Sequence, residues 1–456
     1  MSTLHLTIIH PAIGHIRNER YIRSWQMEPL PAAAIAGLTP DDVTISFYDD
    51  RMETIPFDEP TDAVAISVET YTAKRAYQIA SEYRKRNVPV IMGGFHATLL
   101  PEEVEQYAEA VVVGEAEPIW HEVIGDLRSG RLKRRYQSSE RPSLEHLRLD
   151  RSIFKRKRYL PIGLIETGRG CRYSCEFCAI QAFFDSTHRN RPIDDIVEEI
   201  RSIKNKKKVF FFVDDNFIGN PKKAKALLRA LIPLKIRWIT QMSIDGAYDE
   251  ELLQLLDASG CKGVLIGFES LDEQNLKQMN KSFNTMHGGY ENALANLRRY
   301  NIRVYATFVF GYDRDTPASF DEAVAFAVRQ QFYIAAFNHL TPFPGTPLYE
   351  QLASQGRLRF EQWWLDEHYR YNDLPFHPVQ LSPEEVTRRC VAARRKFYSI
   401  GSIFKRLLGA HNRSDAFMLR NYLPINWMHR RDVSSRNGYP LGDENWQGEL
   451  LKVQRP

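Results

Sequence analysis

The sequence predicts an α/β protein with a doubly wound parallel sheet at the N-terminus, followed by a partial β/α barrel and a helical C-terminal region. Three observations predict this fold class. Short apolar runs alternate with helix-like segments over residues 4–127, and the same alternation returns over residues 160–342. After about residue 350 the strand-like runs stop and helical patterns remain. Such alternation is typical of parallel strands joined by helices.

Length and composition bound the class of protein. The chain has 456 residues, enough for several domains, and its 43% hydrophobic and 26% charged residues are typical of a globular protein. A net charge of +4 is too small to indicate nucleic-acid binding, and we expect no nucleic-acid partner. Without a signal-peptide pattern or a spanning apolar run, we expect a cytoplasmic location. In that reducing compartment, a tight cysteine cluster favours metal binding or catalysis over disulfides.

The N-terminal elements alternate in order. Strands are expected within residues 4–11, 42–51, 62–70, 88–94 and 108–115, and helices within 28–38, 73–87, 95–103 and 117–127. We expect residues 1–132 to form this domain. Residues 133–159 carry many charges and few apolar positions, so we expect a linker there, whose basic runs form a solvated surface.

Ligands of parallel sheets bind at the carboxyl ends of the strands. Glycine there lets the backbone approach a ligand closely, although it also serves simply to make a tight turn. The residues at these ends are Ser67, Glu69, Thr70, Gly93, Gly94, His96, Gly114 and Glu115.

The second alternation predicts a barrel over residues 160–355. Its strands are expected within 160–168, 208–216, 236–245, 262–270, 303–311 and 333–342, with helices between them. Active sites of such barrels lie at the carboxyl ends of the strands, where polar residues gather here. Residues 356–456 are expected to form a helical and irregular C-terminal region rich in aromatic residues and arginine.

Three of the five cysteines lie in the loop after the first barrel strand, as Cys171, Cys175 and Cys178. Three thiolates this close bind either zinc or an iron–sulfur cluster. A structural zinc site needs a fourth ligand, for which His188 is the candidate, whereas a four-iron cluster with three ligands keeps one iron open. Cys261 and Cys390 are expected in the core.

The Cys-x₃-Cys-x₂-Cys loop, with Phe177 before its last cysteine, resembles that of the radical S-adenosylmethionine (SAM) superfamily. The resemblance implies that Cys171, Cys175 and Cys178 hold a 4Fe-4S cluster whose open iron chelates SAM, with Phe177 beside it. In that family the reduced cluster breaks the sulfonium C–S bond and releases a deoxyadenosyl radical.

The resemblance implies further SAM contacts at later strand ends. Asp214, Asp215 and Asn216 stand where the family binds the SAM amine, and Glu269 lies in a segment, LIGFES, that resembles the family's fourth strand. The other contacts implied are Phe310 and Gly311 beside adenine, and Pro344 and Gly345 in the closing turn. The third strand departs from the family, because it carries Gln241 and Ser243 where many relatives carry a carboxylate-binding arginine.

The N-terminal half resembles the cobalamin-binding domain of the anaerobic cyclase, phosphonate methylase and hopanoid methylase group. The segments GGFHATLLPEE and VVVGEAE carry this resemblance, which implies cobalamin at the strand ends named above. The Asp-x-His-x-x-Gly signature is absent, and His10 and His15 lack its spacing. Relatives without it either bind cobalamin with the lower face of cobalt free or keep only the fold. We therefore expect no protein imidazole on cobalt.

These resemblances imply a radical SAM enzyme, foremost a cobalamin-dependent methyltransferase acting on an unactivated carbon. The alternative is a radical SAM enzyme with a vestigial cobalamin domain that performs cyclisation, oxidation or carbon–carbon coupling, and a third class is a zinc-binding or interaction protein. The partners expected are a small-molecule or lipid substrate and an electron donor such as flavodoxin or ferredoxin. Cations and aromatic residues mix over residues 388–431, which predicts either a helical cap or a peripheral membrane contact.

Overall fold

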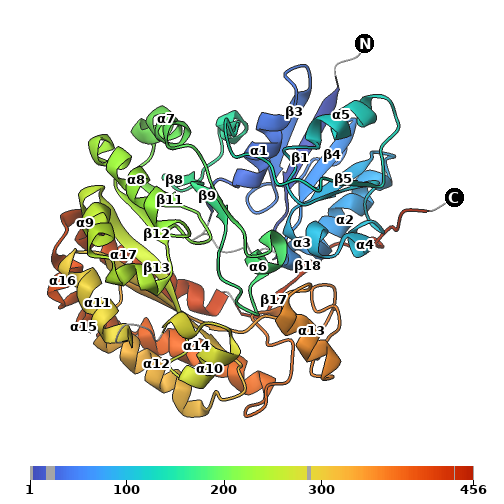
Figure 1. The fold of residues 1–456 in the computed structure, drawn as a ribbon. Helices are drawn as coiled ribbons and strands as arrows, with labels where there is room; N and C mark the ends of the chain where they lie inside the picture. Colours follow the sequence, from blue (N-terminus) through green and yellow to red (C-terminus); the bar gives the residue numbers. More distant parts are fainter. Residues whose placement is uncertain (1–3, 17–25, 285–288, 436, 455–456) are drawn as a thin grey trace. The chain divides into compact units, whose positions relative to one another are not determined.

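The computed structural model describes residues 4–16, 26–284, 289–435 and 437–454 (Figure 1). It divides the chain into two compact units. Unit 1 comprises Met1–Leu160, Phe360–Tyr371 and Gly438–Pro456, and unit 2 comprises Pro161–Arg359 and Asn372–Asn437. The chain therefore returns to unit 1 twice after leaving it.

Unit 1 is built on a six-stranded sheet of order β3-β1-β4-β5-β6-β7, in which all neighbours are parallel. The strands are β1 (His5–His10), β3 (Thr44–Asp49), β4 (Ala63–Ser67), β5 (Val90–Gly93), β6 (Ala110–Val113) and β7 (Arg135–Gln137). Helices α1 (Leu30–Leu38) and α5 (Trp120–Arg128) share a core with these strands, and α2 (Ala73–Arg84) connects β4 to β5. The central strands are apolar because both faces of a parallel sheet are covered.

The segment expected to be a linker instead contributes to unit 1. Its residues Arg135–Gln137 form the edge strand β7, in which Tyr136 is only 2% exposed and donates a hydrogen bond to Asp126. Arg135 forms ion pairs with Glu102 and Glu105. Charged residues suit an edge strand, so the charged composition of this segment hid the strand.

The C-terminal region contributes to both units. In unit 1, β16 (Arg370–Tyr371) pairs with β17 (Tyr439–Pro440), and β18 (Gly442–Asp443) pairs with β2 (Gly14–His15). Trp363 and Trp364 are buried there. These short pairings involve too few residues to produce a strand pattern in the sequence, which explains why the region was predicted without strands.

Unit 2 is a partial β/α barrel, as predicted. Its six parallel strands have the order β15-β14-β13-β12-β11-β8, so each strand lies beside the preceding strand of this sheet, and β8 and β15 are the two unpaired edges. The strands are β8 (Ile162–Ile165), β11 (Val209–Phe212), β12 (Trp238–Gln241), β13 (Cys261–Glu269), β14 (Arg303–Phe310) and β15 (Ile334–His339). The helices are α7 (Ile193–Ile203), α8 (Pro221–Leu231), α9 (Glu250–Ala258), α11 (Gly289–Arg299), α12 (Pro317–Arg329) and α14 (Pro383–Phe397).

The two faces of the barrel sheet differ in burial. On β14, Phe308 and Phe310 are buried in the core shared with the helices, whereas Thr307 and Val309 stay half-buried. In a closed β/α barrel the inner face is a packed core. The inner face here keeps partly exposed side chains, as an open barrel that admits a ligand requires.

The turn after β5 depends on Gly94. Its φ is +98°, and a Cβ there would lie 2.9 Å from the carbonyl oxygen of Val68. We expect Gly94→Val to destabilise unit 1 by about 3 kcal/mol or more, because backbone strain and steric overlap add. Urea unfolding of the purified variant measures this, and a Gly94→Val protein that unfolds at the parent's urea concentration would contradict it.

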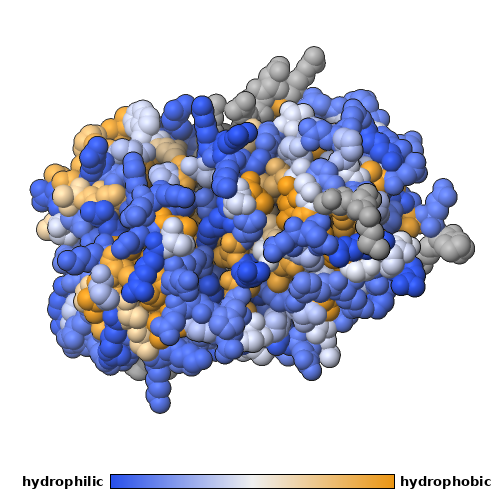
Figure 2. All heavy atoms as spheres, turned by 90° about the horizontal axis from the view of Figure 1, so that it is seen from above, coloured by the Kyte–Doolittle hydropathy of each residue, from blue (hydrophilic) through white to orange (hydrophobic). Residues whose placement is uncertain are grey.

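The C-terminal part of unit 2 is helical, with α15 (Ile400–Leu407), α16 (Ala410–Arg413) and α17 (Ala416–Ser435). Within the described ranges, no helix combines the length and apolar character needed to cross a membrane. Hydrophilic side chains cover most of the face seen in Figure 2, and apolar side chains reach it in patches.

Candidate functional site

The three clustered cysteines lie on a short loop at the carboxyl end of β8. The loop runs from β9 (Gly168–Gly170) to α6 (Ala179–Phe184), and β9 pairs with β10 (His188–Asn190) in an antiparallel manner. At Gly170 the φ is +86°, and a Cβ would lie 2.0 Å from the carbonyl oxygen of Thr187, so only glycine fits before the first cysteine. Cys175 is buried, and Cys171 and Cys178 are half-buried.

The chain after α10 (Glu273–Gln278) holds this loop in place. The Asn280 side-chain amide donates to the backbone oxygen of Ser174 at 2.9 Å and to its hydroxyl at 2.8 Å. The rings of Tyr173 and Phe283 stack with their centroids 3.9 Å apart. The spacing of the thiols is therefore supported by protein contacts that do not involve a metal.

Burial controls the protonation of the three thiols. Desolvation raises the pKa of Cys175 to about 12, and Cys178 and Cys171 add to the rise while Lys281 opposes it. Burial also raises the pKa values of Cys171 and Cys178. Because cysteine binds a metal as the thiolate, metal binding at this loop would release these protons.

The donor set fits an iron–sulfur cluster with one iron left open. It consists of three thiols within eight residues of one loop, one of them buried and two half-buried. In the part of the chain that the structure describes, no group of three or more His, Cys, Asp or Glu side chains is arranged so that it could hold a single metal ion.

Glu269 ends β13 in a strained position beside the cysteine loop. Its φ is +60°, and the register of β13 against β14 shifts between Gly267 and Glu269. The carboxylate accepts from Lys281 Nζ at 2.7 Å, and the two side chains are 9% and 12% exposed. A Cβ at Gly267 would lie 2.1 Å from Glu269 Oε1, so glycine leaves room for this ion pair. Backbone strain at a strand end often marks a functional site.

The segment Asp214 to Asn216 organises the cysteine loop. Asp215 Oδ2 accepts from the backbone N–H of Gly170 at 2.8 Å, next to the first cysteine. The Asn216 side-chain amide contacts Cys171 Sγ at 3.9 Å and donates to Ser243 Oγ at 3.1 Å. These side chains therefore position the first cysteine, which adds to the SAM-amine role predicted for them.

Asp214 is buried, with Oδ1 accepting from the backbone N–H and the hydroxyl of Thr167 at 3.1 and 2.7 Å, while Oδ2 has no hydrogen-bond partner among the described residues. Burial raises its pKa to about 7. An unfolded aspartate titrates near pH 4, so the folded state alone holds this proton between about pH 4 and 7, and stability falls as pH rises through that window.

We therefore expect Asp214→Asn to become more stabilising relative to the parent as pH rises from 5 to 8, by about 3 kcal/mol. The amide keeps an acceptor for Thr167 and cannot ionise. Urea unfolding of both apoproteins at pH 5, 6.5 and 8 measures the difference. A difference in unfolding free energy that does not change with pH would contradict the assignment.

On the third strand, Gln241 and Ser243 have different surroundings. Ser243 is paired with Asn216 through both its backbone N–H and its hydroxyl. Gln241 ends β12 on the half-buried inner face, and among the described residues its side chain has no hydrogen-bond partner. Gln241 is therefore the better candidate for the SAM contact predicted for this strand.

The other residues predicted to bind SAM could contact it mainly through backbone atoms. The Phe310 ring stacks on Phe320 of α12 at 4.1 Å, in the outer core and away from the inner face. Gly311 has a φ of +122° and donates its N–H to Asp315 at 2.8 Å. The remaining three are Phe177, which packs partly buried against the barrel core, and Pro344 and Gly345, which lie in the turn before α13 (Pro347–Ser354).

Sequence similarity shows the family to which the region carrying these residues belongs. Residues 165–327, which contain the cysteine loop and Glu269, match the model described as the radical SAM superfamily. The chain is 32% identical over 411 residues to bacteriochlorophyllide d C-12(1)-methyltransferase of Chlorobaculum tepidum, across 88% of this chain and 86% of the relative. The chain belongs to the radical SAM superfamily.

A second radical SAM relative and a solved structure extend the similarity. Bacteriochlorophyllide d C-8(2)-methyltransferase of Chlorobaculum tepidum is 30% identical over 349 residues, across 72% of this chain and 77% of the relative. The methyltransferase TsrM from Kitasatospora setae, solved with cobalamin and a 4Fe-4S cluster, has a TM-score of 0.67 at 17% identity, across 95% of this chain and 100% of that one. At this identity the structure shows a shared fold. The predicted superfamily and enzyme class are confirmed: the chain is a radical SAM enzyme, and the two relatives named here are methyltransferases.

The residues predicted to bind cobalamin lie at the carboxyl edge of the unit 1 sheet of this radical SAM enzyme, and they differ in their exposure. His96 is fully buried, with its ring nitrogens 3.3 Å from Thr70 Oγ1 and 3.0 Å from Glu103 Oε1, so it supports the core. Ser67 is half-buried, whereas Glu69 reaches the surface and receives a hydrogen bond at its backbone oxygen from the Thr72 hydroxyl.

The glycines of this edge differ as well. Gly94 is packed against β4, and a Cβ at Gly93 would be in ordinary contact with Val112 at 3.4 Å. Gly114 has a φ of +83° with open space where a Cβ would stand. Glu115 lies 3.7 Å from Arg141 in an ion pair. Gly114 is therefore the residue of this set that faces unfilled space.

Two sets of interacting side chains near these sites were not predicted from the sequence. Lys281, which pairs with Glu269, follows it by twelve residues across a helix, and nothing in the local pattern marks it. In unit 1, Asp50 accepts two hydrogen bonds from Arg75 at 2.9 Å and contacts His15 at 3.1 Å. The Asp-Asp-Arg run at the end of β3 was a signal for this buried network.

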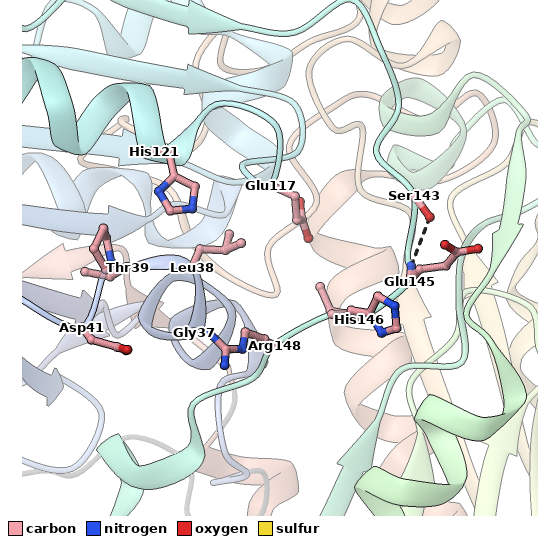
Figure 3. A pocket seen from close by; sticks show the side chains of 12 residues that line it. Gly37, Leu38, Thr39, Asp41, Glu117, His121, Ser143, Glu145, His146 and Arg148 are labelled. Carbon is pink, nitrogen blue, oxygen red and sulfur yellow. Dashed lines mark hydrogen bonds between the residues drawn. The ribbon is translucent and has the colours of Figure 1, made fainter.

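A pocket of about 280 Å³ opens elsewhere in unit 1 (Figure 3). It lies between the end of α1, the start of α5 and the loop 143–148, with Thr39, Asp41, Glu117, His121, His146 and Arg148 among its lining residues. None of the predicted site residues lines it.

Proposed function

We propose that this radical SAM enzyme methylates an unactivated carbon on a side chain of a chlorophyll-type tetrapyrrole, using cobalamin as methyl carrier. The similarity to a bacteriochlorophyllide methyltransferase over 88% of this chain carries the proposal. When bound, the cluster and SAM supply the radical that removes a substrate hydrogen, and cobalamin supplies the methyl group.

The residues of unit 2 have defined roles in this proposal. Cys171, Cys175 and Cys178 hold the cluster, and the Glu269–Lys281 pair presents a fixed carboxylate beside it. The inner face of the barrel carries apolar, partly exposed side chains, namely Phe211, Ile239, Leu265 and Val309. Such a face suits a large apolar substrate, because most of a ligand's contacts in a binding site are apolar.

The cobalamin part of the proposal is tested at Gly114. Gly130 is a matched control, because it also has a positive φ, of +64°, and open space at its Cβ position, but it follows α5 instead of a strand. Since asparagine tolerates positive φ, we expect both asparagine variants to fold. A side chain at position 114 should obstruct the ligand, so Gly114→Asn should weaken cobalamin retention about tenfold, while Gly130→Asn leaves it unchanged.

The measurement is anaerobic reconstitution with hydroxocobalamin, followed by gel filtration and absorbance. Equal retention by the two variants would contradict binding at this strand end. A parent protein that retains no cobalamin and still cleaves SAM to deoxyadenosine would favour the vestigial-domain alternative.

The proposal also includes a small-molecule substrate, a low-potential electron donor such as flavodoxin or ferredoxin, a cytoplasmic location and a peripheral membrane contact. An electron donor is required because the cluster must be reduced before SAM is cleaved. The substrate class is tested by anaerobic turnover against tetrapyrrole, lipid and peptide pools with mass spectrometry. A mass gain of one methylene in a bacteriochlorophyllide is expected, and a gain confined to another pool would overturn the substrate assignment.

A further inference from the structure

Two C-terminal helices of unit 2 expose apolar side chains in regular stripes. Six of the eight large apolar side chains that are exposed among the described residues lie here: Ile400, Phe404 and Leu408 at α15, and Leu419, Leu423 and Trp427 on α17. Their exposed fractions range from 40% to 70%. Because residues four apart lie on one side of a helix, each trio forms a continuous stripe.

The opposite sides of both helices are firmly packed. The Tyr422 hydroxyl donates to the backbone oxygen of Ile403 at 3.0 Å, which joins α17 to α15. Arg406 is fully buried and donates to the backbone oxygen of Phe332 and to Asn426 Oδ1, both at 2.9 Å. The stripes therefore belong to anchored helices with a defined outer face.

The exposed charges of the segment that carries the stripes are cationic, although one of them, Lys396, pairs with the exposed Asp321 at 2.7 Å. Between residues 395 and 431 the exposed charged side chains are Arg395, Lys396, Lys405, Arg413, Arg420, Arg430 and Arg431. The one acidic residue in this range, Asp415, is half-buried and pairs with Lys262 at 3.0 Å. At about 100° per residue, the α17 stripe and its three arginines share an arc of roughly 120°.

We propose that the α15/α17 surface, defined by these six apolar and seven cationic residues, binds an anionic lipid surface peripherally. Apolar side chains with Trp among them enter the boundary between headgroups and acyl chains, and surrounding Lys and Arg side chains are attracted to anionic lipids. A second copy of the chain fits less well, since a symmetric contact would bring the exposed arginines of two α17 helices together. This inference locates the peripheral membrane contact proposed above, and it does not depend on the catalytic proposal.

Vesicle flotation of the anaerobically prepared full-length protein tests the lipid surface. We expect binding to vesicles that contain phosphatidylglycerol, weaker binding in high salt, and little binding to phosphatidylcholine alone. No binding to anionic vesicles, or equal binding to both kinds, would overturn the inference.

Paired substitutions locate the surface. Leu423→Glu with Trp427→Glu, and separately Arg420→Glu with Arg431→Glu, should each lower partitioning at least about tenfold. Val379→Glu is the control, because Val379 is 60% exposed outside this surface. Unchanged iron content and thermal melting establish that the variants fold.

Two results would overturn the assignment of this surface. One is a pair of variants that bind vesicles like the parent. The other is a concentration-dependent dimer of the parent that Trp427→Glu breaks, because that would show a second copy covering the face.

Discussion

Replacing any one of Cys171, Cys175 and Cys178 by alanine should remove the iron–sulfur cluster and abolish SAM cleavage. Each thiol is one of the three proposed ligands, on a loop that the protein holds in place, and the described residues provide no arranged set of metal ligands as a substitute. Iron per chain should fall from about four to near zero, together with the visible absorbance of the cluster. Anaerobic iron and sulfide analysis measures the loss.

Cys390→Ala is the matched control. Cys390 is 2% exposed within α14, far along the chain from the loop, so its loss should cost some stability and leave iron content unchanged. A cysteine-loop variant that keeps full iron, or a parent that carries stoichiometric zinc and no iron after anaerobic purification, would contradict the cluster assignment.

Removing the Glu269 carboxylate should have the second large effect. Glu269→Gln leaves the Lys281 ammonium buried without its partner, and breaking such a pair costs about 3–5 kcal/mol. Burial lowers the pKa of Lys281, but Glu269 and the thiols Cys175 and Cys178 raise it by more. The pKa of Lys281 therefore lies above its ordinary value. We expect Glu269→Gln to lower stability and to weaken SAM binding more than tenfold.

The double variant Glu269→Gln with Lys281→Met separates these two effects. It removes both charges, so stability should recover, while SAM affinity should stay low because the carboxylate is still missing. Calorimetric SAM titration of cluster-loaded protein and urea unfolding measure the two quantities. If the double variant recovers SAM affinity together with stability, the ion pair is structural and Glu269 does not contact SAM.

Local sequence patterns were sufficient to predict those features that depend on one short segment of the chain. The barrel strands could be predicted because each is an apolar run between helix-like segments, and the cysteine loop because all three thiols fall within eight residues. The edge strand β7 could not, since its charged residues hide one buried tyrosine, Tyr136.

Contacts between distant segments were beyond sequence reasoning. Lys281 reaches Glu269 only through the bulge in β13, and the chain returns to unit 1 at Phe360–Tyr371 through buried aromatic residues that read as an irregular tail. Phe310 was expected beside adenine, but its side chain packs against the helices, on the same side of β14 as Phe308. The alternation of side chains along a strand could have shown that these two residues share one face. The resemblance to the radical SAM superfamily predicts which strand ends bind a cofactor. Which side chains at those ends are accessible to the cofactor depends on their burial in the folded protein.

The products of SAM turnover test the central claim most directly. An anaerobic reaction of reduced enzyme with cobalamin, SAM and a bacteriochlorophyllide substrate should yield both S-adenosylhomocysteine and deoxyadenosine, each in step with the methylated tetrapyrrole. The first product reports methyl transfer to the carrier, and the second reports the radical step. Deoxyadenosine without S-adenosylhomocysteine, and with no methylated product, would contradict the methyltransferase account.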